Sequence, residues 1–271
     1  MPLWTLFGLR RGQATLPWPR RRGPAGQEGV LGMPRFEPER CAPDCEACAT
    51  ACPTAAITVE KNGAGGDASE RLRVDYGRCV VCQLCVEACP SGAAIASFDW
   101  AFGVCDRTDL LLVPDEVTTQ RRDAATPRDG FRRSLHIRHV DAGSCNGCES
   151  ELQALNNPFY NLHRLGIFFT PSPRFADLLL VTGPVTYAMH EPLRRAYEAM
   201  PEPRWVMACG TCAVSGGAVG GGYACGNGLD GVVPVDLYLP GCPPNPSAII
   251  EALLMFLDRM PQRVRGGRVV G

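Results

Sequence analysis

The side chains of this sequence that can do chemistry are its cysteines, of which there are 15. Many of them stand two or three residues apart, which is not the pattern of a secreted disulfide scaffold. One pair, Cys145 and Cys148, stands alone in the segment DAGSCNGCESELQAL. A lone C-x-x-C pair can be half of a zinc site, a thiol redox pair or part of an iron–sulfur ligand set. The chemistry therefore depends on which other cysteines join it.

The front of the chain carries a repeated cysteine motif. The segment that starts at Glu39 reads ERCAPDCEACATACPTAAITV, and the segment that starts at Gly77 reads GRCVVCQLCVEACPSGAAIAS. The second is a C-x2-C-x2-C-x3-C-P run, in which three thiolates bind one cubane cluster and the fourth binds the cluster of the other repeat. This exchange predicts one cluster on Cys41, Cys45, Cys48 and Cys89, and a second on Cys79, Cys82, Cys85 and Cys52.

A pair of zinc sites is the alternative, because four thiolates also suit Zn²⁺. Zinc ribbons use two separated C-x-x-C pairs, whereas a duplicated run of three close cysteines followed by Cys-Pro is typical of a two-cluster ferredoxin. The first copy departs from this pattern, since three residues instead of two separate Cys41 from Cys45. The spacing favours iron–sulfur clusters and makes the first loop one residue longer.

Composition and periodicity divide the chain into parts. Residues 36–100 form the predicted α+β two-cluster ferredoxin-like domain, with strands at Ile57–Glu60 and Arg71–Asp75 in a hairpin around a glycine-rich tip. A polar, proline-containing stretch makes residues 101–133 the predicted linker. The other predicted parts are a basic arm at 1–35, a second domain at 134–262 and a tail at 263–271.

Charge and hydropathy limit the expected partners. The net charge of −1 gives no reason to expect nucleic-acid binding, and no apolar run is long enough to span a bilayer. Residues 1–36 hold six arginines against one acid, Glu28. This arm is interpreted either as a flexible segment or as a docking segment for an acidic subunit or a membrane surface. It has no apolar stretch after its arginines, so a twin-arginine export signal is not expected.

The second half alternates between short apolar runs and helical stretches, which predicts βα units around a parallel sheet. The predicted strands are Leu135–Val140, Asp177–Thr182, Arg204–Ala208 and Val235–Leu239. The predicted helices are Glu149–Leu155, Pro192–Met200 with its proline in the first turn, and Pro246–Met260 with Asn245 as N-cap. Because parallel strands end at one edge of a sheet, the cysteines that follow them can converge there. These cysteines are Cys145, Cys148, Cys212 and Cys242.

Four segments of this half are highly specific: GSCNGCESE, PSPRFADLLLVTGPVT, ACGTCAVSGG and PVDLYLPGCPPNP. They closely resemble the small subunit of membrane-associated, energy-converting [NiFe] hydrogenases of the formate hydrogenlyase type, and the homologous B subunit of respiratory complex I. The resemblance covers Ser134 to Met260. The front half, including LRRGQAT before FEPERC, resembles the two-cluster ferredoxin subunit of the same hydrogenases. The chain thus resembles a fusion of two subunits.

The resemblance implies a flavodoxin-like α/β core without flavin, and a third [4Fe–4S] cluster on Cys145, Cys148, Cys212 and Cys242. Cys209 competes with Cys212 as a ligand, and the family pattern around CGTC selects Cys212. The C-x-x-C spacing favours the hydrogenase branch, because complex I has two adjacent cysteines there. Glu151 matches a family glutamate near the catalytic subunit, which implies a proton path. A glutamate placed for the dipole at a helix start is the alternative.

The remaining polar side chains are interpreted as structural. Cys105, Cys209 and Cys225 are predicted to be small buried hydrophobes. His136, His139, His163 and His190 fit no ligand spacing. The segment SGGAVGGGYACGNG lacks the ending of a phosphate-binding loop and is predicted to pack closely or to move beside the third cluster.

The resemblance implies an iron–sulfur electron-transfer subunit of a membrane-associated [NiFe] hydrogenase, peripheral on the cytoplasmic face of the cell membrane. Three [4Fe–4S] clusters would connect a Ni–Fe large subunit with a redox partner, which is formate or carbon monoxide dehydrogenase, ferredoxin or quinone. Membrane subunits of a complex I-like arm complete the expected partners. This chain alone is not expected to turn over hydrogen, because the family's nickel ligands belong to the large subunit. The alternatives are a complex I-like subunit that passes electrons to quinone, and a zinc-stabilised assembly scaffold.

Overall fold

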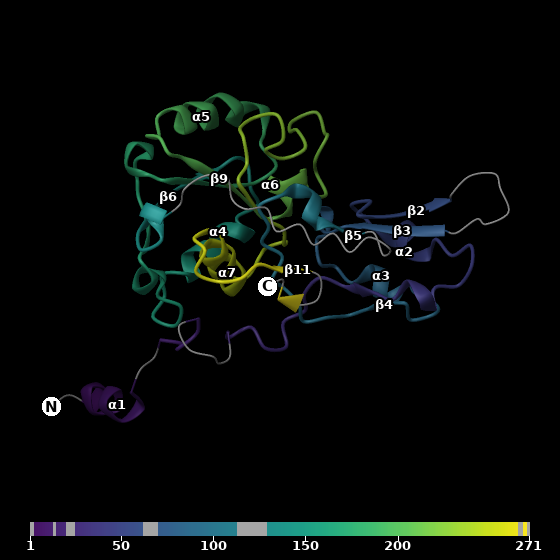
Figure 1. The fold of residues 1–271 in the computed structure, drawn as a ribbon, viewed down its shortest axis with the longest axis horizontal. Coiled ribbons are helices and arrows are strands. Elements are labelled where there is room, and N and C mark those ends of the chain that lie inside the picture. The colour runs from purple at the N-terminus through teal and green to yellow at the C-terminus, as the bar shows by residue number, and fades with distance from the viewer. Residues whose placement is uncertain are drawn as a thin grey trace.

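The chain folds into an α/β domain with a smaller, hairpin-containing domain beside it (Figure 1). The structure is a computed structural model that describes residues 3–12, 15–19, 25–61, 70–112, 129–264 and 268–269. The glycine-rich hairpin tip, the arginines at 20–22 and the polar stretch at 113–128 lie outside the described residues.

The C-terminal domain is built on a five-stranded sheet in which every pairing is parallel. Its strands are, in spatial order, β7 (Ile167–Phe169), β6 (Leu135–Asp141), β8 (Leu178–Thr182), β9 (Trp205–Cys209) and β10 (Leu237–Leu239). Numbered along the chain, this order is 2-1-3-4-5. Four of the strands overlap the predicted ones, and the edge strand β7 was not predicted. Every residue of β8 and β9 is buried, as expected for parallel strands covered on both faces.

Helices cover both faces of this sheet (Figure 1). They are α4 (Gly147–Ala154), α5 (Tyr187–Glu198), α6 (Thr211–Ser215) and α7 (Pro246–Phe256). Alternate residues of each strand point to opposite faces. Leu178 and Leu180 belong to the apolar cluster with α4 and α7, whereas Leu179 and Val181 belong to the cluster with α5 and α6.

The starts of helices α7 and α5 can be compared with those predicted from the sequence. The N-cap of α7 is confirmed, because the Asn245 side chain accepts a hydrogen bond of 2.8 Å from the amide of Ala248. The predicted start of α5 at Pro192 is wrong, because Pro192 lies inside that helix. The helix begins earlier because the amide of Tyr187 is anchored on the carbonyl of Ala224, a contact between segments distant in sequence.

The front domain carries the predicted hairpin, in which β2 (Ile57–Lys61) pairs antiparallel with β3 (Glu70–Asp75). Two short helices, α2 (Ala47–Ala51) and α3 (Leu84–Glu87), occupy matching places in the two repeats. A second antiparallel pair joins β1 (Arg35–Phe36) to β4 (Ala94–Ile95). The 3₁₀ turns of the chain include η1 (Pro38–Arg40), η2 (Tyr76–Arg78), η3 (Arg107–Leu110), η4 (Asp129–Phe131), η5 (Leu162–Leu165) and η6 (Pro173–Phe175).

The first part of the predicted linker is instead part of the folded core. Residues 101–112 contain η3 and strand β5 (Leu111–Leu112), which adds to the hairpin by pairing with β3. The backbone of Val104 exchanges hydrogen bonds of 2.8 and 2.9 Å with Tyr238 on β10. Val104 and Leu110 are fully buried in one apolar cluster that runs from the front domain to the sheet. The segment therefore joins the two domains and covers an edge strand.

Residues 15–19 and 25–27 of the basic arm pack on the C-terminal domain, which corrects the interpretation of this stretch as a flexible segment. After the exposed helix α1 (Leu3–Arg11), Trp18 is buried against the second domain's core. The guanidinium group of Arg164 donates to the carbonyls of Leu16 and Trp18. The hydroxyl of Ser247 donates to the carbonyl of Ala25 at 2.6 Å. The arm is thus held through its own backbone carbonyls, which accept hydrogen bonds from the C-terminal domain. Amino-acid composition does not predict such contacts.

The predicted tail contains an antiparallel pair, β11 (Arg263–Val264) with β12 (Arg268–Val269). Within the described ranges, no helix combines the length and the apolar character required to cross a bilayer.

The joining role of residues 101–112 predicts a large effect of Leu110→Ala. The side chain of Leu110 is fully buried, so its truncation should lower the free energy of unfolding by about 2–5 kcal/mol. Leu111→Ala is the matched control, because Leu111 is 42% exposed and should change stability by no more than about 0.5 kcal/mol. Urea denaturation followed by circular dichroism measures both. Equal small losses would show that this segment is a linker after all.

Candidate metal centres

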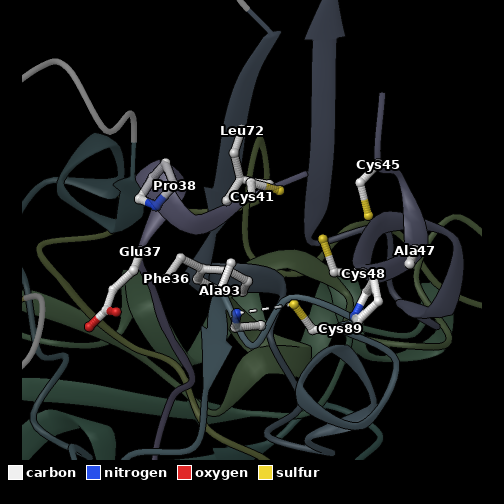
Figure 2. Close-up of a pocket in the computed structure, with 12 residues that line it drawn as sticks. Phe36, Glu37, Pro38, Cys41, Cys45, Ala47, Cys48, Leu72, Cys89 and Ala93 are labelled. Atoms are coloured by element: carbon white, nitrogen blue, oxygen red, sulfur yellow. Dashed lines mark hydrogen bonds between the residues drawn. The ribbon is translucent and has the colours of Figure 1, made fainter. Parts of the chain in front are cut away.

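The first ligand set surrounds a pocket in the front domain (Figure 2). The cysteines that line it are Cys41, Cys45, Cys48 and Cys89. Phe36, Pro38, Leu72 and Ala93 form much of the remaining wall. Burial raises the pKa of the Cys48 thiol, and the charges of Cys41 and Cys89 raise it further. The structure therefore brings cysteines of both repeats together, as the exchanged pattern requires.

The second set lies around Cys79, at the end of the turn η2. Burial raises the pKa of Cys79 to about 12, and the charges of Cys85, Cys52 and Cys82 act in the same direction. Burial likewise raises the pKa of Cys85 to about 11, with Cys82 as the next cause. Cys52 comes from the first repeat, so this set also crosses between the repeats.

Backbone amides point at the sulfur atoms. The amides of Ala56, Val81 and Ala94 donate to the sulfurs of Cys52, Cys79 and Cys89 at 3.2, 3.4 and 3.4 Å. Thr54 and Ser91 place their hydroxyls 3.7 Å from Cys52 and Cys89, respectively. Against the opposing effect of burial, these donors lower the pKa of Cys89. Such bonds favour the thiolate, which is the form that binds a metal.

The third set gathers at the carboxyl edge of the parallel sheet. Cys145 and Cys148 follow β6, Cys212 is the second residue of α6 after β9, and Cys242 follows β10. Burial raises the pKa of Cys212 to about 11, and the charges of Cys242 and Cys145 raise it further. Burial also raises the pKa of Cys148, with contributions from Cys209, Cys212 and Cys242. Four thiols from three parts of the chain thus lie within electrostatic reach of one another.

The C-x-x-C loops of the two domains share a local geometry. Gln83, between Cys82 and Cys85, has a φ of 64°, and Asn146, between Cys145 and Cys148, has a φ of 66°. In both loops this left-handed residue is followed directly by a short helix that carries the second cysteine. The lone pair in the C-terminal domain is therefore presented like a ferredoxin pair.

Glycines give the third set its room. A Cβ atom at Gly210 would lie 2.6 Å from the sulfur of Cys148, and one at Gly217 would lie 3.0 Å from the sulfur of Cys212. Both positions have positive φ values, 91° and 59°. The carboxylate of Asp141 accepts hydrogen bonds from the amides of Gly143 and Ser144 and so fixes the loop before Cys145. Side chains at these glycines would push the sulfur atoms aside.

Three cysteines lie outside these sets: Cys209, Cys225 and Cys105. The charges of Cys209 and Cys225 still reach Cys148 and Cys212, respectively. Cys209 is fully buried at the end of β9, as predicted, although its sulfur lies close enough to influence Cys148. Cys225 is buried and donates to the carbonyl of Val219 at 3.1 Å. Cys105 is only half-buried, which corrects its prediction as a buried residue, and its sulfur lies 4.0 Å from that of Met255.

A polar network beside Cys148 was missed by sequence reasoning. Glu149 accepts a hydrogen bond from the buried hydroxyl of Thr182, which also lies 2.9 Å from His139. Burial lowers the pKa of His139, while the charge of Glu149 opposes this shift. The direct adjacency of Glu149 to Cys148 was the available signal. Glu151, the acid singled out from the sequence, is half-buried, and burial raises its pKa.

These donor sets fit iron–sulfur clusters by their chemistry. Each set is made of thiols. In the front domain backbone amides donate to the sulfur atoms, and in the C-terminal domain glycines leave space beside them. No described group of three or more His, Cys, Asp or Glu side chains is arranged around a single metal ion. The thiols of the first set line a pocket instead (Figure 2).

Comparison with known proteins agrees with this division of the chain. The family described as NADH ubiquinone oxidoreductase, 20 Kd subunit, matches residues 145–256, and the 4Fe-4S dicluster domain matches residues 32–93. An uncharacterized protein of Methanocaldococcus jannaschii is 50% identical over 123 residues, which cover 45% of this chain and 82% of that protein. The chain therefore belongs to the NADH ubiquinone oxidoreductase 20 kDa subunit family and carries a 4Fe–4S dicluster domain in front.

Two relatives carry the names of hydrogenase complexes. The probable membrane-bound hydrogenase subunit mbhJ of Pyrococcus furiosus is 40% identical over 134 residues, 49% of this chain and 80% of that protein. Formate hydrogenlyase subunit 7 of Escherichia coli is 44% identical over 134 residues, 49% of this chain. The chain spans about half of the latter protein, 52% of its length. The resemblance to hydrogenase small subunits, fused to a dicluster ferredoxin, is thereby confirmed.

The tight approach of Gly210 to Cys148 predicts the effect of Gly210→Ala. The added methyl group meets the Cys148 sulfur in a backbone conformation that alanine rarely adopts, so most molecules should lose iron from the C-terminal domain. The front domain should keep its iron. Gly226→Ala is the control, because a Cβ at Gly226 has no atom within 4 Å. Iron analysis after anaerobic purification measures both, and equal iron contents would contradict the placement of Cys148 as a ligand.

Proposed function

We propose that the chain is the iron–sulfur electron-transfer subunit of a membrane-associated [NiFe] hydrogenase complex, with three [4Fe–4S] clusters. The observation that carries this proposal is the gathering of Cys145, Cys148, Cys212 and Cys242 at one sheet edge beside a dicluster domain. Flavodoxin-like topology supports it, because a parallel sheet of order 2-1-3-4-5 binds ligands at its carboxyl edge.

The residues around each site have separate roles in binding a cluster. A [4Fe–4S] cluster supplies a reversible one-electron redox couple when bound. The thiolates of the three sets hold the clusters, and backbone amides on Cys52, Cys79 and Cys89 offset their negative charge. Apolar side chains such as Phe36 and Leu72 line the pocket of the first set. We assign hydrogen chemistry to a separate Ni–Fe large subunit, because the nickel ligands of the hydrogenases that this chain resembles belong to that subunit.

The names of two relatives support the hydrogenase assignment and a location at a membrane. One is a subunit of formate hydrogenlyase, and the other is a probable membrane-bound hydrogenase subunit. We place this chain at the cytoplasmic face of the cell membrane, as a peripheral part of such a complex. Its redox partner is a formate or carbon monoxide dehydrogenase, a ferredoxin or a quinone.

The second candidate function is a complex I-like subunit that passes electrons to quinone, which the 20 kDa subunit family favours. Nickel in the purified complex, together with hydrogen-dependent dye reduction, distinguishes the two functions. A complex that contains clusters but neither nickel nor this activity would support the quinone alternative. Zinc without acid-labile sulfide would instead favour an assembly scaffold.

The proposal predicts that Cys148→Ser damages the third cluster alone. Serine keeps the size of the side chain but removes the thiolate, so the EPR signal of the C-terminal cluster should be lost or strongly altered after anaerobic reduction. The signals of the front pair should remain, because their ligands lie in the other domain. Cys105→Ser is the matched control, since Cys105 lies in none of the three sets. Loss of all signals in Cys148→Ser, or of none, would refute the assignment.

A further inference from the structure

One buried hydroxyl connects the two domains between their cysteine sets. Thr211 is fully buried at the start of α6, directly before Cys212. Its hydroxyl donates to the carbonyl of Cys79 at 2.8 Å and accepts from the amide of Gly241 at 3.0 Å. The amide of Thr211 in turn donates to the carbonyl of Gly241 at 2.9 Å.

The partners of Thr211 make this contact notable. Cys79 belongs to the second ligand set of the front domain, whereas Cys212 and Cys242 belong to the third set. Gly241 is the residue before Cys242. A single side chain therefore ties the backbone of one set to the backbone next to two members of another.

A purely local role does not account for this geometry. A threonine that caps its own helix accepts a hydrogen bond from an amide two or three residues further on. The N-cap of α6 is Gly210, and the hydroxyl of Thr211 instead crosses to η2 and to the loop after β10. Both the donor and the acceptor function of the hydroxyl are used outside the helix, as expected for a fully buried group.

We propose that Thr211 is a positioning residue for electron transfer between the second and the third cluster site. This inference rests on the proposed function. It assigns the Cys79 set as the front site adjacent to the C-terminal one, with the carbonyl of Cys79, the hydroxyl of Thr211 and the backbone of Cys212 as the connecting path. One electron passes, so one cluster is oxidised as the other is reduced, and no proton is needed. The hydrogen bonds of Thr211 fix the separation of the two sites. They also connect the two sites by an unbroken path of covalent and hydrogen bonds.

The test compares Thr211→Val with Thr211→Ser in the full chain loaded with iron and sulfide. Valine has the shape of threonine without the hydroxyl, whereas serine keeps the hydroxyl. Rapid photoreduction followed by freeze-quench EPR measures how fast electrons equilibrate between the front pair and the third cluster. We expect Thr211→Val to slow this exchange several-fold with unchanged iron content, and Thr211→Ser to restore most of the rate. Equal rates in Thr211→Val and the native chain, or no rescue by serine, would overturn the proposal.

Hydrogen exchange at the amide of Gly241 gives a readout that does not depend on electron transfer. Loss of its acceptor in Thr211→Val should speed exchange roughly tenfold, the factor expected for one hydrogen bond of ordinary strength. An unprotected Gly241 amide in the native chain would overturn the proposal even if the variants failed to hold iron. A chain that shows this protection but no reducible clusters would instead refute the proposed function.

Discussion

Parallel strands that end at a common edge are the constraint on which the third site depends. Cys145 and Cys242 are almost a hundred residues apart, and no local motif connects them. The sheet order places β6, β8, β9 and β10 side by side, so the loops that follow them share one region of space. Burial of every residue in β8 and β9 holds this arrangement by apolar packing on both faces. The same apolar cluster continues into the front domain, where it includes cysteines of both front sets, and it contains Ala213 and Val214 beside Cys212.

Thiolates that are buried close together repel one another, and nearby backbone amides reduce this repulsion. Burial and mutual repulsion raise the pKa values of Cys79, Cys85 and Cys212 to between about 11 and 12. These groups are neutral in the metal-free chain near neutral pH, and metal binding would release their protons. Amides that donate to Cys52 and Cys89 act against the repulsion at the ligands exchanged between repeats. Each of these two exchanged ligands also has a hydroxyl 3.7 Å from its sulfur, that of Thr54 at Cys52 and that of Ser91 at Cys89.

The sequence predicts some parts of this structure well because their information is local. The spacing of the cysteines identifies the ferredoxin repeat, and Asn245 followed by Pro246 identifies the N-cap of α7. The strands β6, β8, β9 and β10 follow from apolar runs. Three residues of β7 are too few for a periodic signal, and the position of Pro192 inside α5 depends on a contact with Ala224. Residues 101–112 read as a linker because the contacts of Val104 and Leu110 come from both domains.

The candidate sites follow the same division. Motifs and family resemblance predict which cysteines form each ligand set. The roles of Glu149, Thr182 and Thr211 depend instead on tertiary contacts. Glu149 is next to Cys148 in the sequence, but the contacts of Thr182 with Glu149 and of Thr211 with Cys79 join residues distant in sequence. Fusion of the two domains into one chain gives such contacts a fixed partner, which two separate subunits would have to find by assembly.

We propose that one chain holds three [4Fe–4S] clusters, two in the front domain and one at the sheet edge. Mössbauer spectroscopy of the full chain, purified anaerobically with ⁵⁷Fe, tests it most directly when combined with iron counting. We expect iron for three clusters per chain, with all of it in cubane form. Iron for two clusters only, or zinc in place of iron at the sheet edge, would contradict it.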